Sequence, residues 1–330
     1  MVTRKIFDEA LAIVKQNFDV EENQSDAPFL RQELIEKLQG KVGVIVRLTD
    51  RIDDDLLSHC PGLQIVSNIA VGYNNIDVEA CTRRKVMVTN TPGVLDDTTA
   101  DFTWTLLLAT ARRVVEADQY LRSSKWKGWE LMDFLGHDVH HKVLCICGLG
   151  RIGQRVARRA KGFKMQILYT DIMRAERRIE EELGTRFVDK KTLLSESDFV
   201  TLHVPLFPQT THYLSIAEFY LMKPHAILIN ASRGPVIDEK ALAQALEEGK
   251  IAGAGLDVYE KEPEIEPALI QMKNVVLAPH IASASRETRL QMAKMAAENL
   301  VAGLMGNRPP NLVNEEIFLS QENKKESKRT

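Results

Sequence analysis

Several features that mark particular classes of protein are missing from this 330-residue sequence. It has no apolar run long enough to cross a membrane, and its opening segment, MVTRKIFDEA, lacks the apolar core of a signal peptide. The formal charge is only −3 at pH 7, with both signs interleaved, so there is no basic stripe for nucleic acid and no polybasic membrane anchor. We therefore expect a cytoplasmic protein with neither nucleic acid nor membrane as a partner.

Cysteine is also scarce. The four cysteines are Cys60, Cys81, Cys145 and Cys147, and they show neither a CxxC pair nor the spacing of metal ligands. Reduced thiols are therefore the default expectation. Cys145 and Cys147 alternate along one face of a β-prone run, which fits small buried residues.

A histidine-rich stretch invites interpretation as a metal site. His137, Asp138, His140 and His141 carry suitable ligand atoms. Nothing in the pattern fixes their spacing on a helix, however, and a solvated loop is the better interpretation. We predict no bound metal.

The composition that remains is that of a globular protein, with 44% hydrophobic and 27% charged residues. A chain of 330 residues is too long for one ordinary core, so two domains are expected. Short β-prone and helical patterns alternate from the start of the chain to about Thr89. This alternation predicts a small domain built on a parallel sheet.

The most informative stretch is residues 142–171, KVLCICGLGRIGQRVARRAKGFKMQILYTD. A β-prone run leads into Gly148, Gly150 and Gly153 in GxGxxG spacing, and a helical pattern and a second β-prone run follow. Gly148 permits a tight turn, Gly150 lets the backbone approach a pyrophosphate, and Gly153 allows close helix–strand packing. The helix N-terminus favours the anion. Glycines also serve ordinary turns, but this strand–helix–strand context predicts a dinucleotide site.

An acidic residue closes this stretch. Asp171 stands roughly 20 residues beyond the glycine motif, where the acid that binds the adenosine ribose is expected. It should accept hydrogen bonds from the ribose hydroxyls and repel a 2′-phosphate, so NADH is predicted over NADPH. Arg174, Arg177 and Arg178 leave binding of a 2′-phosphate open, although a charged helix face explains them equally well.

Further β-prone runs follow Asp171 and suggest a complete doubly wound sheet. Together with the two runs already described they make six, at residues 143–147, 166–170, 199–204, 226–230, 253–258 and 275–278. A long helical pattern from Thr98 to about Arg122 precedes them. After Ser285 a helix to about Met305 and an extended strand, Pro309 to Val313, are expected to pack on the first domain.

These patterns predict an α/β fold with two parallel-sheet domains. The first comprises residues 1–98 and 285–330 and is discontinuous, and residues 99–284 form the dinucleotide-binding domain. Within the first domain, VTRKI (residues 2–6) and residues 18–21 are predicted to be short strands. The final QENKKESKRT is expected to be a solvated tail.

Three polar residues follow predicted strands of the dinucleotide-binding domain, at the edge where ligands bind in such sheets. They are Arg233 after ILINAS, Glu262 after GLDVY, and His280 after VVLAP. An arginine can hold a carboxylate bidentately, a histidine can exchange a proton near neutral pH, and a neighbouring glutamate favours the charged imidazolium. Each alone has an ordinary structural explanation, but together with a dinucleotide they predict carbonyl reduction beside a carboxylate.

The sequence resembles the D-isomer-specific 2-hydroxyacid dehydrogenase family over nearly its whole length, and most closely its glyoxylate/hydroxypyruvate reductase branch. The stretches that carry the resemblance are AVGYNNID (70–77), NTPGVLDDTTAD (90–101), GLGRIG (148–153), HVPLFPQTTHYL (203–214), INASRGPVIDEKAL (229–242), GAGLDVYEKEP (253–263) and APHIASA (278–284). The resemblance implies a Rossmann-type dinucleotide-binding domain and a discontinuous, flavodoxin-like substrate domain.

The resemblance also implies roles for individual residues. Arg233 would bind the substrate carboxylate together with the backbone amides of Val71 and Gly72, His280 would be the acid/base, and Glu262 would orient and charge it. The residues expected at the cofactor are Thr99, Gly148, Gly150, Arg151, Ile152, Gly153, Asp171 and Asp257. Trp129 matches an aromatic residue that reaches the substrate site of the partner subunit, so a homodimer is expected.

Some positions depart from the family pattern. His141 and Cys145 stand where the family usually has glycines, and Asp101 stands where it often has glutamate. None of these three positions is among the glycines of the GxGxxG motif. The departures therefore bear on local packing and not on the fold.

The expected function is NADH-dependent reduction of glyoxylate or hydroxypyruvate to glycolate or D-glycerate. Hydride would pass to the carbonyl carbon while His280 donates a proton to the oxygen. Two alternatives remain open. One is another 2-oxo acid reductase of the family, acting on a 2-ketogluconate-, pyruvate- or phosphoglycerate-type substrate. The other is an NAD-sensing interaction protein on the same fold, although the sequence lacks added binding segments.

Overall fold

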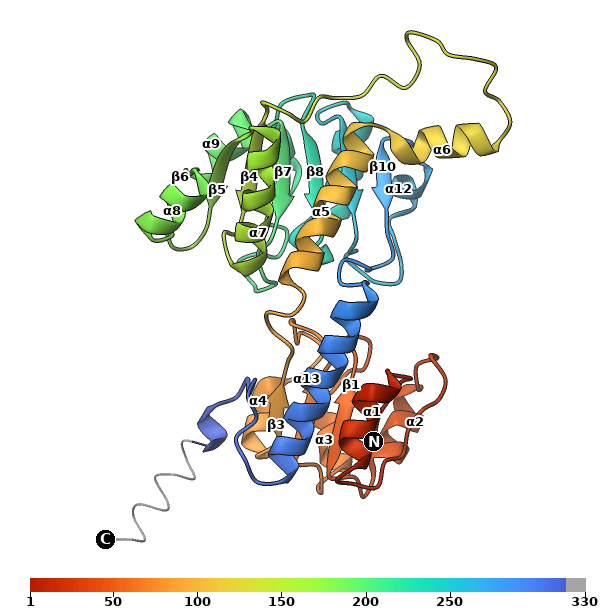
Figure 1. Cartoon of the computed structure of the whole chain (residues 1–330), viewed down its shortest axis with the longest axis vertical. Helices are drawn as coiled ribbons and strands as arrows, with labels where there is room; N and C mark the ends of the chain where they lie inside the picture. The colour runs from red at the N-terminus through yellow and green to blue at the C-terminus, as the bar shows by residue number, and fades with distance from the viewer. Residues whose placement is uncertain (319–330) are drawn as a thin grey trace. The chain divides into compact units, whose positions relative to one another are not determined.

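The computed structural model describes residues 1–318, so the predicted tail at 321–330 lies outside the described residues. The chain divides into two compact units, each with a sheet and flanking helices (Figure 1). The terminal unit comprises Met1–Leu95 and the chain from Ser285 onward, and the central unit comprises Asp96–Ala284. The first boundary thus follows Leu95, whereas the sequence analysis set it after residue 98.

The sheet of the terminal unit has three parallel strands in the order β1-β2-β3. They are β1 (Gly43–Val46), β2 (Ile65–Asn68) and β3 (Met87–Thr89). Val2 extends this sheet by parallel bridges to Ile45 on one side and Glu22 on the other. Across the sheet the extended segments therefore lie in the order Glu22, Val2, β1, β2, β3. Numbered along the chain this is 2-1-3-4-5, the flavodoxin-like order.

The prediction of strands at residues 2–6, 18–21 and 309–313 was wrong. Only isolated bridges form there, at Val2 in the first segment, at Glu22 just after the second and at Leu312 in the third. In the first segment the pairing is short, with the Thr3 amide donating to the Ile45 carbonyl at 3.1 Å, and in the third Pro309 and Pro310 cannot donate backbone hydrogen bonds. The last segment nevertheless packs on this unit, because Leu312 bridges Thr89 and the Val313 amide donates to the Val88 carbonyl at 2.8 Å.

Two layers of helices cover this small sheet. They are α1 (Asp8–Lys15) and α13 (Arg286–Leu304) on one face, and α2 (Arg31–Leu38), α3 (Asp54–His59) and α4 (Val78–Arg83) on the other. The alternation of strand side chains explains both layers, since Ile45 and Ile65 belong to the α1–α13 core and Val44 and Val66 to the opposite core.

The central unit contains a seven-stranded parallel sheet in the order β10-β9-β8-β7-β4-β5-β6. Its strands are β4 (Val143–Cys147), β5 (Gln166–Thr170), β6 (Thr185–Phe187), β7 (Phe199–Leu202), β8 (Ile227–Asn230), β9 (Gly253–Leu256) and β10 (Val275–Leu277). This is the doubly wound dinucleotide-binding order with one more strand, and β4 lies at the switch point. The predicted count of six was wrong because β6 is a three-residue edge strand whose central residue, Arg186, is exposed.

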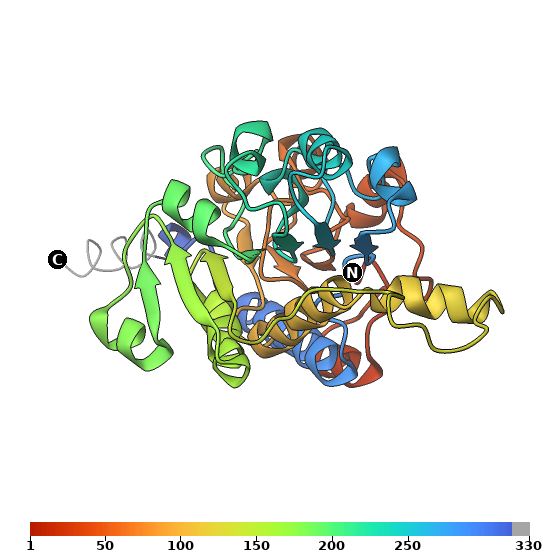
Figure 2. The same cartoon turned by 90° about the horizontal axis from the view of Figure 1, so that it is seen from above.

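Helices flank both faces of this sheet, as Figure 2 shows from above. On one face α5 (Asp96–Ala111) and α7 (Arg151–Ala160) enclose a core that includes Leu144, Ile146 and Tyr169. On the other face the core includes Cys145, Cys147 and Leu228 under α9 (Lys190–Glu196), α10 (Ile216–Phe219), α11 (Glu239–Glu247) and α12 (Pro267–Gln271). The remaining helix, α8 (Arg177–Leu183), precedes β6.

The long helix predicted from Thr98 to Arg122 is broken. It forms α5 and a separate α6 (Val114–Arg122), because Arg113 adopts the left-handed conformation with φ of 53°. The Arg113 guanidinium stabilises the break through two hydrogen bonds to Glu116, at 2.9 and 3.0 Å, and one to the Leu135 carbonyl at 3.3 Å. No residue of α6 is buried, and Figure 1 shows α6 and the segment after it extending away from the sheet.

One departure from the family pattern has a backbone consequence. His141, at a position where a glycine is usual, has φ of 62° and donates its amide hydrogen bond to Phe163 at 3.0 Å. A non-glycine residue in this region is strained. The strain is tolerated because the following strand, β4, is fully embedded in the sheet.

Replacing His141 by glycine is expected to stabilise the central unit by up to about 1 kcal/mol, because relief of the strain exceeds the added entropy of the unfolded chain. The midpoint of thermal unfolding should rise by about 2 °C. His140→Gly is the matched control, since it removes the same contact between the two rings without a left-handed backbone to relieve. Equal midpoints for the two variants would contradict the assigned strain.

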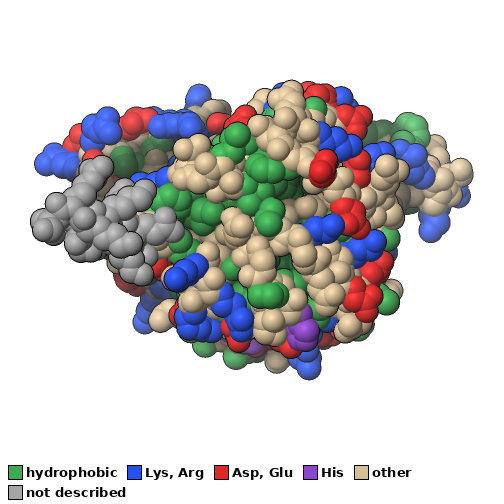
Figure 3. Space-filling view, turned by 90° about the horizontal axis from the view of Figure 1, so that it is seen from below, with side chains coloured by type: hydrophobic (Ala, Val, Ile, Leu, Met, Phe, Trp, Pro, Cys, Tyr) green, Lys and Arg blue, Asp and Glu red, His purple; other side chains and the backbone are tan. Residues whose placement is uncertain are grey.

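No helix within residues 1–318 is long and apolar enough to span a membrane. On the face drawn in Figure 3, basic and acidic side chains lie interspersed among hydrophobic and neutral ones.

Candidate active site

The glycine motif forms the turn between β4 and α7. Gly148 has φ of 94°, and a Cβ there would lie 2.8 Å from the His203 carbonyl, so both conformation and space require glycine. A Cβ on Gly153 would lie 2.1 Å from the Gly148 carbonyl oxygen, which explains the close helix–strand contact. Gly150 faces open space, with nothing within 4 Å of a Cβ. The turn therefore has the shape and the open approach that a pyrophosphate needs.

The helix that follows this turn begins with free amides. Gly150 is the N-cap of α7 and has no side chain to cap it, and Arg151 and Ile152 form the first turn. The Arg151 guanidinium donates a 2.8 Å hydrogen bond to Asp96. A helix N-terminus with uncapped amides favours an anion, so the residues of this turn fit the phosphates of a dinucleotide.

Asp171 lies directly after β5 and contacts the glycine turn. One carboxylate oxygen accepts a 2.8 Å hydrogen bond from the Leu149 amide, and the other accepts one from the Ile172 amide at 2.7 Å. The side chain is thus fixed beside the motif, where the ribose acid is expected.

Two of the arginines that follow Asp171, Arg174 and Arg177, are engaged elsewhere. Arg174 binds Glu180 through two hydrogen bonds of 2.9 and 2.8 Å, and the Tyr169 hydroxyl donates to the same carboxylate at 2.6 Å. Arg177 pairs with Glu181 at 2.8 Å along the surface of α8. These contacts are those of a charged helix face.

The three candidate catalytic residues follow adjacent strands, because β8, β9 and β10 are neighbours. Arg233 comes from a turn that the Asn230 side chain fixes, donating to the Arg233 carbonyl at 3.0 Å and accepting from the Ser232 amide at 3.0 Å. The Arg233 side chain is partly buried and donates to the Ser232 carbonyl at 2.6 Å. Within residues 1–318 it forms no salt bridge, and burial lowers its pKa, although the charge of Glu262 opposes the shift. Such a cation is suited to an external carboxylate.

Glu262 and His280 form a pair. His280 Nδ1 lies 2.9 Å from Glu262 Oε2, and Glu262 Oε1 accepts a hydrogen bond from the Tyr259 amide at 3.1 Å. Partial burial alone would raise the pKa of Glu262, but the hydrogen bond from His280 and the charges of His280 and Arg233 hold it below its ordinary value. The carboxylate occupies Nδ1, which leaves Nε2 of the ring for a substrate.

The turn that carries His280 is held by a buried carboxylate. Asp257 has no exposed surface, and its two oxygens accept hydrogen bonds from the amides of Ile281, at 2.7 Å, and Ala282, at 2.8 Å. His280 itself has φ of 55° and donates its amide hydrogen bond to the Asp257 carbonyl at 2.9 Å. Burial raises the pKa of Asp257, and the two amide bonds oppose that shift. In the structure Asp257 therefore orients the His280 turn, and its contact with a nicotinamide amide stays a prediction.

In the terminal unit the loop after β2 contains Val71 and Gly72. Asn68 donates to the Gly72 carbonyl at 2.9 Å, and Asn90 donates to the Val71 carbonyl at 2.8 Å. With their carbonyls fixed by side-chain amides, the orientation of both peptide groups is set. Asn75, later in the same loop, donates to the carbonyls of Arg47 and Asp50, both at 3.1 Å.

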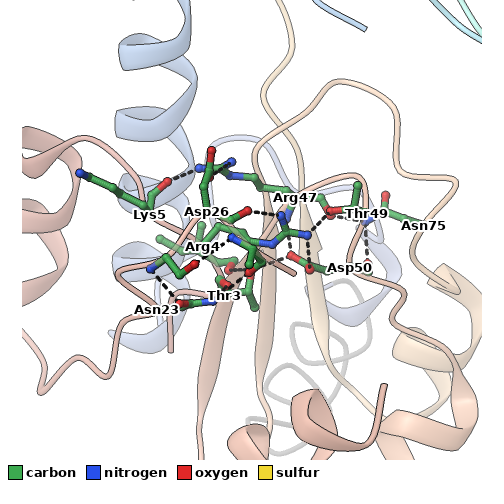
Figure 4. A network of polar contacts seen from close by, with 12 residues as sticks. Thr3, Arg4, Lys5, Asn23, Asp26, Arg47, Thr49, Asp50 and Asn75 are labelled. Carbon is green, nitrogen blue, oxygen red and sulfur yellow. Dashed lines mark hydrogen bonds and ion pairs between the residues drawn. The ribbon is translucent and has the colours of Figure 1, made fainter. Parts of the chain in front are cut away.

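The partners of Asn75 belong to a buried polar network, shown in Figure 4. Asp50 accepts hydrogen bonds from the Thr3 hydroxyl at 2.5 Å and from the Arg47 amide at 2.9 Å. Arg4 donates to the Thr49 hydroxyl at 2.7 Å and lies 3.8 Å from Asp50. The network ties the segment after β1 to the loop of Val71 and Gly72.

The comparison with known proteins starts from the dinucleotide-binding region. Residues 104–282 match the family model described as D-isomer specific 2-hydroxyacid dehydrogenase, NAD binding domain. The chain belongs to the D-isomer-specific 2-hydroxyacid dehydrogenase family. The predicted family and fold class are confirmed, and this 2-hydroxyacid dehydrogenase is an oxidoreductase with a nicotinamide dinucleotide cofactor.

Individual relatives support the same family over the whole chain. The dehydrogenase is 52% identical over 319 residues to a glyoxylate reductase of Korarchaeum cryptofilum strain OPF8, covering 96% of each chain. A solved glyoxylate reductase from Paecilomyes thermophila has a TM-score of 0.84 at 29% identity and covers 96% of this chain and 98% of that one. An NADPH-dependent glyoxylate/hydroxypyruvate reductase from Sinorhizobium meliloti, in complex with NADP and malonate, has a TM-score of 0.83 at 31% identity, covering 95% and 96% of the two chains.

Two other predicted site residues lie in different surroundings. Thr99 is buried in the first part of α5, where its carbonyl accepts a hydrogen bond from the Thr103 hydroxyl at 2.8 Å. Trp129 is 77% exposed in the segment after α6, and no contact joins it to Arg233 or His280 among the described residues. The roles of both residues stay predictions.

Within residues 1–318 no three His, Cys, Asp or Glu side chains are grouped so that they could hold a metal ion. The four cysteines are buried and unpaired there, and burial raises the pKa of Cys81 and Cys147 to about 12.

Some residues that shape the site were missed by the sequence analysis. Asn75 and Asp50 hold the loop of Val71 and Gly72, and Glu239 contacts the loop of Glu262. Asn75 lies within AVGYNNID and Glu239 within INASRGPVIDEKAL, so the motifs contained them. Their types gave no further signal, because an asparagine in a loop and an acid in the first turn of a helix are both ordinary.

Proposed function

We propose that this dehydrogenase reduces glyoxylate or hydroxypyruvate with NADH, forming glycolate or D-glycerate. The observation that carries the proposal is the His280–Glu262 pair, 2.9 Å apart, at the edge of the sheet that also carries Arg233, because the three residues follow the consecutive strands β10, β9 and β8. Relatives named glyoxylate reductase, at 52% identity for the one from Korarchaeum cryptofilum, support the substrate class.

The residues of the pair divide the work of proton transfer. Glu262 holds Nδ1 of His280, so the protonated ring has Nε2 free to donate to the carbonyl oxygen of the substrate. The charge of Glu262 stabilises the imidazolium before the transfer. When bound, the reduced nicotinamide supplies a hydride to the carbonyl carbon.

Arg233 fixes the substrate for this step. Its guanidinium can bind the carboxylate bidentately and set the distance of the 2-oxo group from His280. We assign the backbone amides of Val71 and Gly72 to the same carboxylate, as the family pattern implies. The side-chain amides of Asn68 and Asn90 support this assignment, since they fix the two peptide groups.

The proposed preference for NADH rests on Asp171 and on the state of the neighbouring arginine. The Asp171 carboxylate, fixed by the Leu149 amide at 2.8 Å, should repel a 2′-phosphate. Arg174, which could neutralise that phosphate, is instead held by Glu180 through two hydrogen bonds.

Asp171→Ser is expected to reduce the preference for NADH over NADPH by about tenfold, because it removes the charge that repels the 2′-phosphate. The measurement is kcat/KM for each coenzyme at saturating 2-oxo acid. Asp189→Ser is the matched control, since Asp189 caps α9 after β6 and has no part in the glycine turn. A wild type that prefers NADPH, or an unchanged ratio in Asp171→Ser, would reject the coenzyme assignment.

We also propose a homodimer. Large apolar side chains are exposed on α6 and the segment after it, namely Val114, Val115, Leu121, Trp126, Trp129, Leu131, Met132 and Leu135. An exposed apolar surface of this extent is typical of a contact between subunits. Trp129 is the residue we assign to the substrate site of the partner subunit.

A steady-state panel tests the proposed reaction directly. Glyoxylate, hydroxypyruvate, pyruvate and 2-ketogluconate are each supplied with NADH and with NADPH, and the highest kcat/KM is expected for glyoxylate or hydroxypyruvate with NADH. A higher value for pyruvate or 2-ketogluconate would reassign the substrate. Tight coenzyme binding without turnover of any 2-oxo acid would reject the enzyme in favour of an NAD-sensing protein.

A further inference from the structure

Glu239, the first residue of α11, has a buried carboxylate that the proposed reaction does not use. It is 6% exposed, although an acid at this position of a helix usually faces solvent. Capping of α11 does not require it, because Asp238 is the N-cap and accepts a 3.1 Å hydrogen bond from the Ala241 amide. The burial of Glu239 therefore needs another explanation.

The carboxylate of Glu239 holds the loop that carries Glu262. One oxygen accepts a hydrogen bond from the Glu260 amide at 2.5 Å, and the other accepts one from the Glu266 amide at 3.1 Å. The two amides bracket Glu262 in the sequence, and a Lys261–Glu264 bridge closes the loop between them. Both ends of the loop are thus fixed to a single side chain.

The same region packs against the turn of Arg233. A Cβ on Gly234 would lie 1.8 Å from the Tyr259 carbonyl oxygen, so the backbone after Arg233 is in direct contact with the start of the Glu262 loop. The Tyr259 amide in turn donates to Glu262 Oε1 at 3.1 Å. Displacing the loop would therefore disturb Glu262 first and the Arg233 turn next.

The charges around Glu239 make this arrangement costly. Burial raises its pKa, the two amide bonds oppose that shift, and the carboxylates of Glu260 and Glu266 add to it. His212 Nε2, 3.1 Å from Glu260, is the titratable partner that faces the cluster from the segment before α10. Burying an acid among like charges costs free energy, and the two amide hydrogen bonds offset part of that cost.

We propose that Glu239 is a positioning residue that fixes the Glu262 loop and, through Glu262, orients His280 for proton transfer. This inference rests on the proposed reduction for its kinetic consequence. It parallels the role of Asp257, whose carboxylate accepts two amides of the turn that carries His280. The two members of the pair are thus each held by a buried carboxylate that binds two backbone amides.

Glu239→Gln is the discriminating substitution, because it keeps the shape of the side chain. A carboxylate accepts both amide hydrogen bonds, whereas a carboxamide accepts only one and directs its own NH2 group at the other N–H. One end of the loop is then released. Glu239→Asp, which keeps two acceptor oxygens on a shorter stem, should restore part of the lost activity.

The test is a double-mutant cycle on the full-length protein with Glu239→Gln, Glu262→Gln and the double variant. Glu239→Gln alone should lower kcat/KM about tenfold and shift the alkaline fall of reduction to lower pH, while the Kd for NADH stays unchanged. In the Glu262→Gln background it should add less than about a twofold loss. Asp238→Ala is the matched control, which removes the N-cap of α11 and should lower stability without moving the pH profile.

A second readout does not depend on turnover. The titration of the His280 ring is followed by NMR in the wild type, Glu239→Gln, Glu262→Gln and the double variant. A shift caused by Glu239→Gln only when Glu262 is present supports the proposal, whether or not the protein reduces glyoxylate. An unchanged His280 titration in Glu239→Gln, or equal losses of kcat/KM in both backgrounds, would overturn it and leave Glu239 a purely structural residue.

Discussion

Arg233→Ala is expected to lower kcat/KM for the 2-oxo acid by about three orders of magnitude, with most of the loss persisting at saturating substrate. The reason is the environment of the guanidinium. It is partly buried, and within residues 1–318 it forms no salt bridge and donates to the Ser232 carbonyl at 2.6 Å. We propose that the substrate carboxylate supplies the opposite charge at this site, so that without the guanidinium the 2-oxo group would not be held near His280.

The measurement is steady-state kinetics at saturating NADH, with circular dichroism to show that the variant is folded. Arg233→Lys should recover only part of the activity, because an ammonium group cannot reproduce the bidentate geometry. Arg186→Ala is the matched control, since it removes an exposed arginine of the same sheet that pairs with Glu196 at 3.1 Å. Near-normal kcat/KM in a folded Arg233→Ala variant would place the carboxylate elsewhere.

Glu262→Gln should lower kcat/KM by about tenfold above neutral pH, because reduction then loses its protonated general acid at lower pH. In the proposed reaction reduction requires protonated His280, so activity is expected at low pH and should fall as pH rises. The wild-type carboxylate 2.9 Å from Nδ1 favours the proton, and its removal should move the alkaline fall down by about one pH unit. The acid limb of hydroxy-acid oxidation, which needs neutral His280, should move down as well.

The pKa of Glu262 sets the lowest pH at which His280 keeps a negatively charged partner. Because the folded protein holds that pKa below the ordinary 4.5, the negative charge beside His280 persists as pH falls through the usual range of a carboxyl group. Wild-type reduction should therefore be maintained near pH 5. The profile is measured as kcat/KM for the 2-oxo acid at saturating NADH, and Glu264→Gln, in the same loop, is the control. If both limbs of Glu262→Gln coincide with those of the wild type, the pair does not act in proton transfer.

The features that the sequence analysis identified are those set by local pattern. The glycines of the β4–α7 turn are dictated by backbone geometry, since Gly148 has φ of 94° and Gly153 nearly touches the Gly148 carbonyl. The order of polar residues after β8, β9 and β10 follows from the parallel sheet, whose carboxyl ends share one edge. Motif and strand therefore located Arg233, Glu262 and His280.

Features that depend on distant contacts were missed. The break at Arg113 requires Glu116 and the Leu135 carbonyl, and the periodicity of α5 gave no sign of either. The strand β6 is recognisable only through its pairing with β5, because TRF is too short to show a period. Glu239 resembled an ordinary first-turn acid, and its contacts with the amides of Glu260 and Glu266 exist only after folding.

The contact between Asp171 and Leu149 limits how coenzyme use can be redesigned. The carboxylate that we assign to ribose recognition also accepts the Leu149 amide of the phosphate-binding turn, at 2.8 Å. A shorter residue at position 171 leaves that amide without its acceptor. The affinities for NADH and NADPH should then both fall, and this loss offsets any gain in NADPH affinity from removing the charge. An engineered switch must therefore supply a new acceptor for Leu149 as well as a cation for the phosphate. Selectivity and turn geometry are coupled at this position, and a library that varies residue 171 alone will enrich for weak binders.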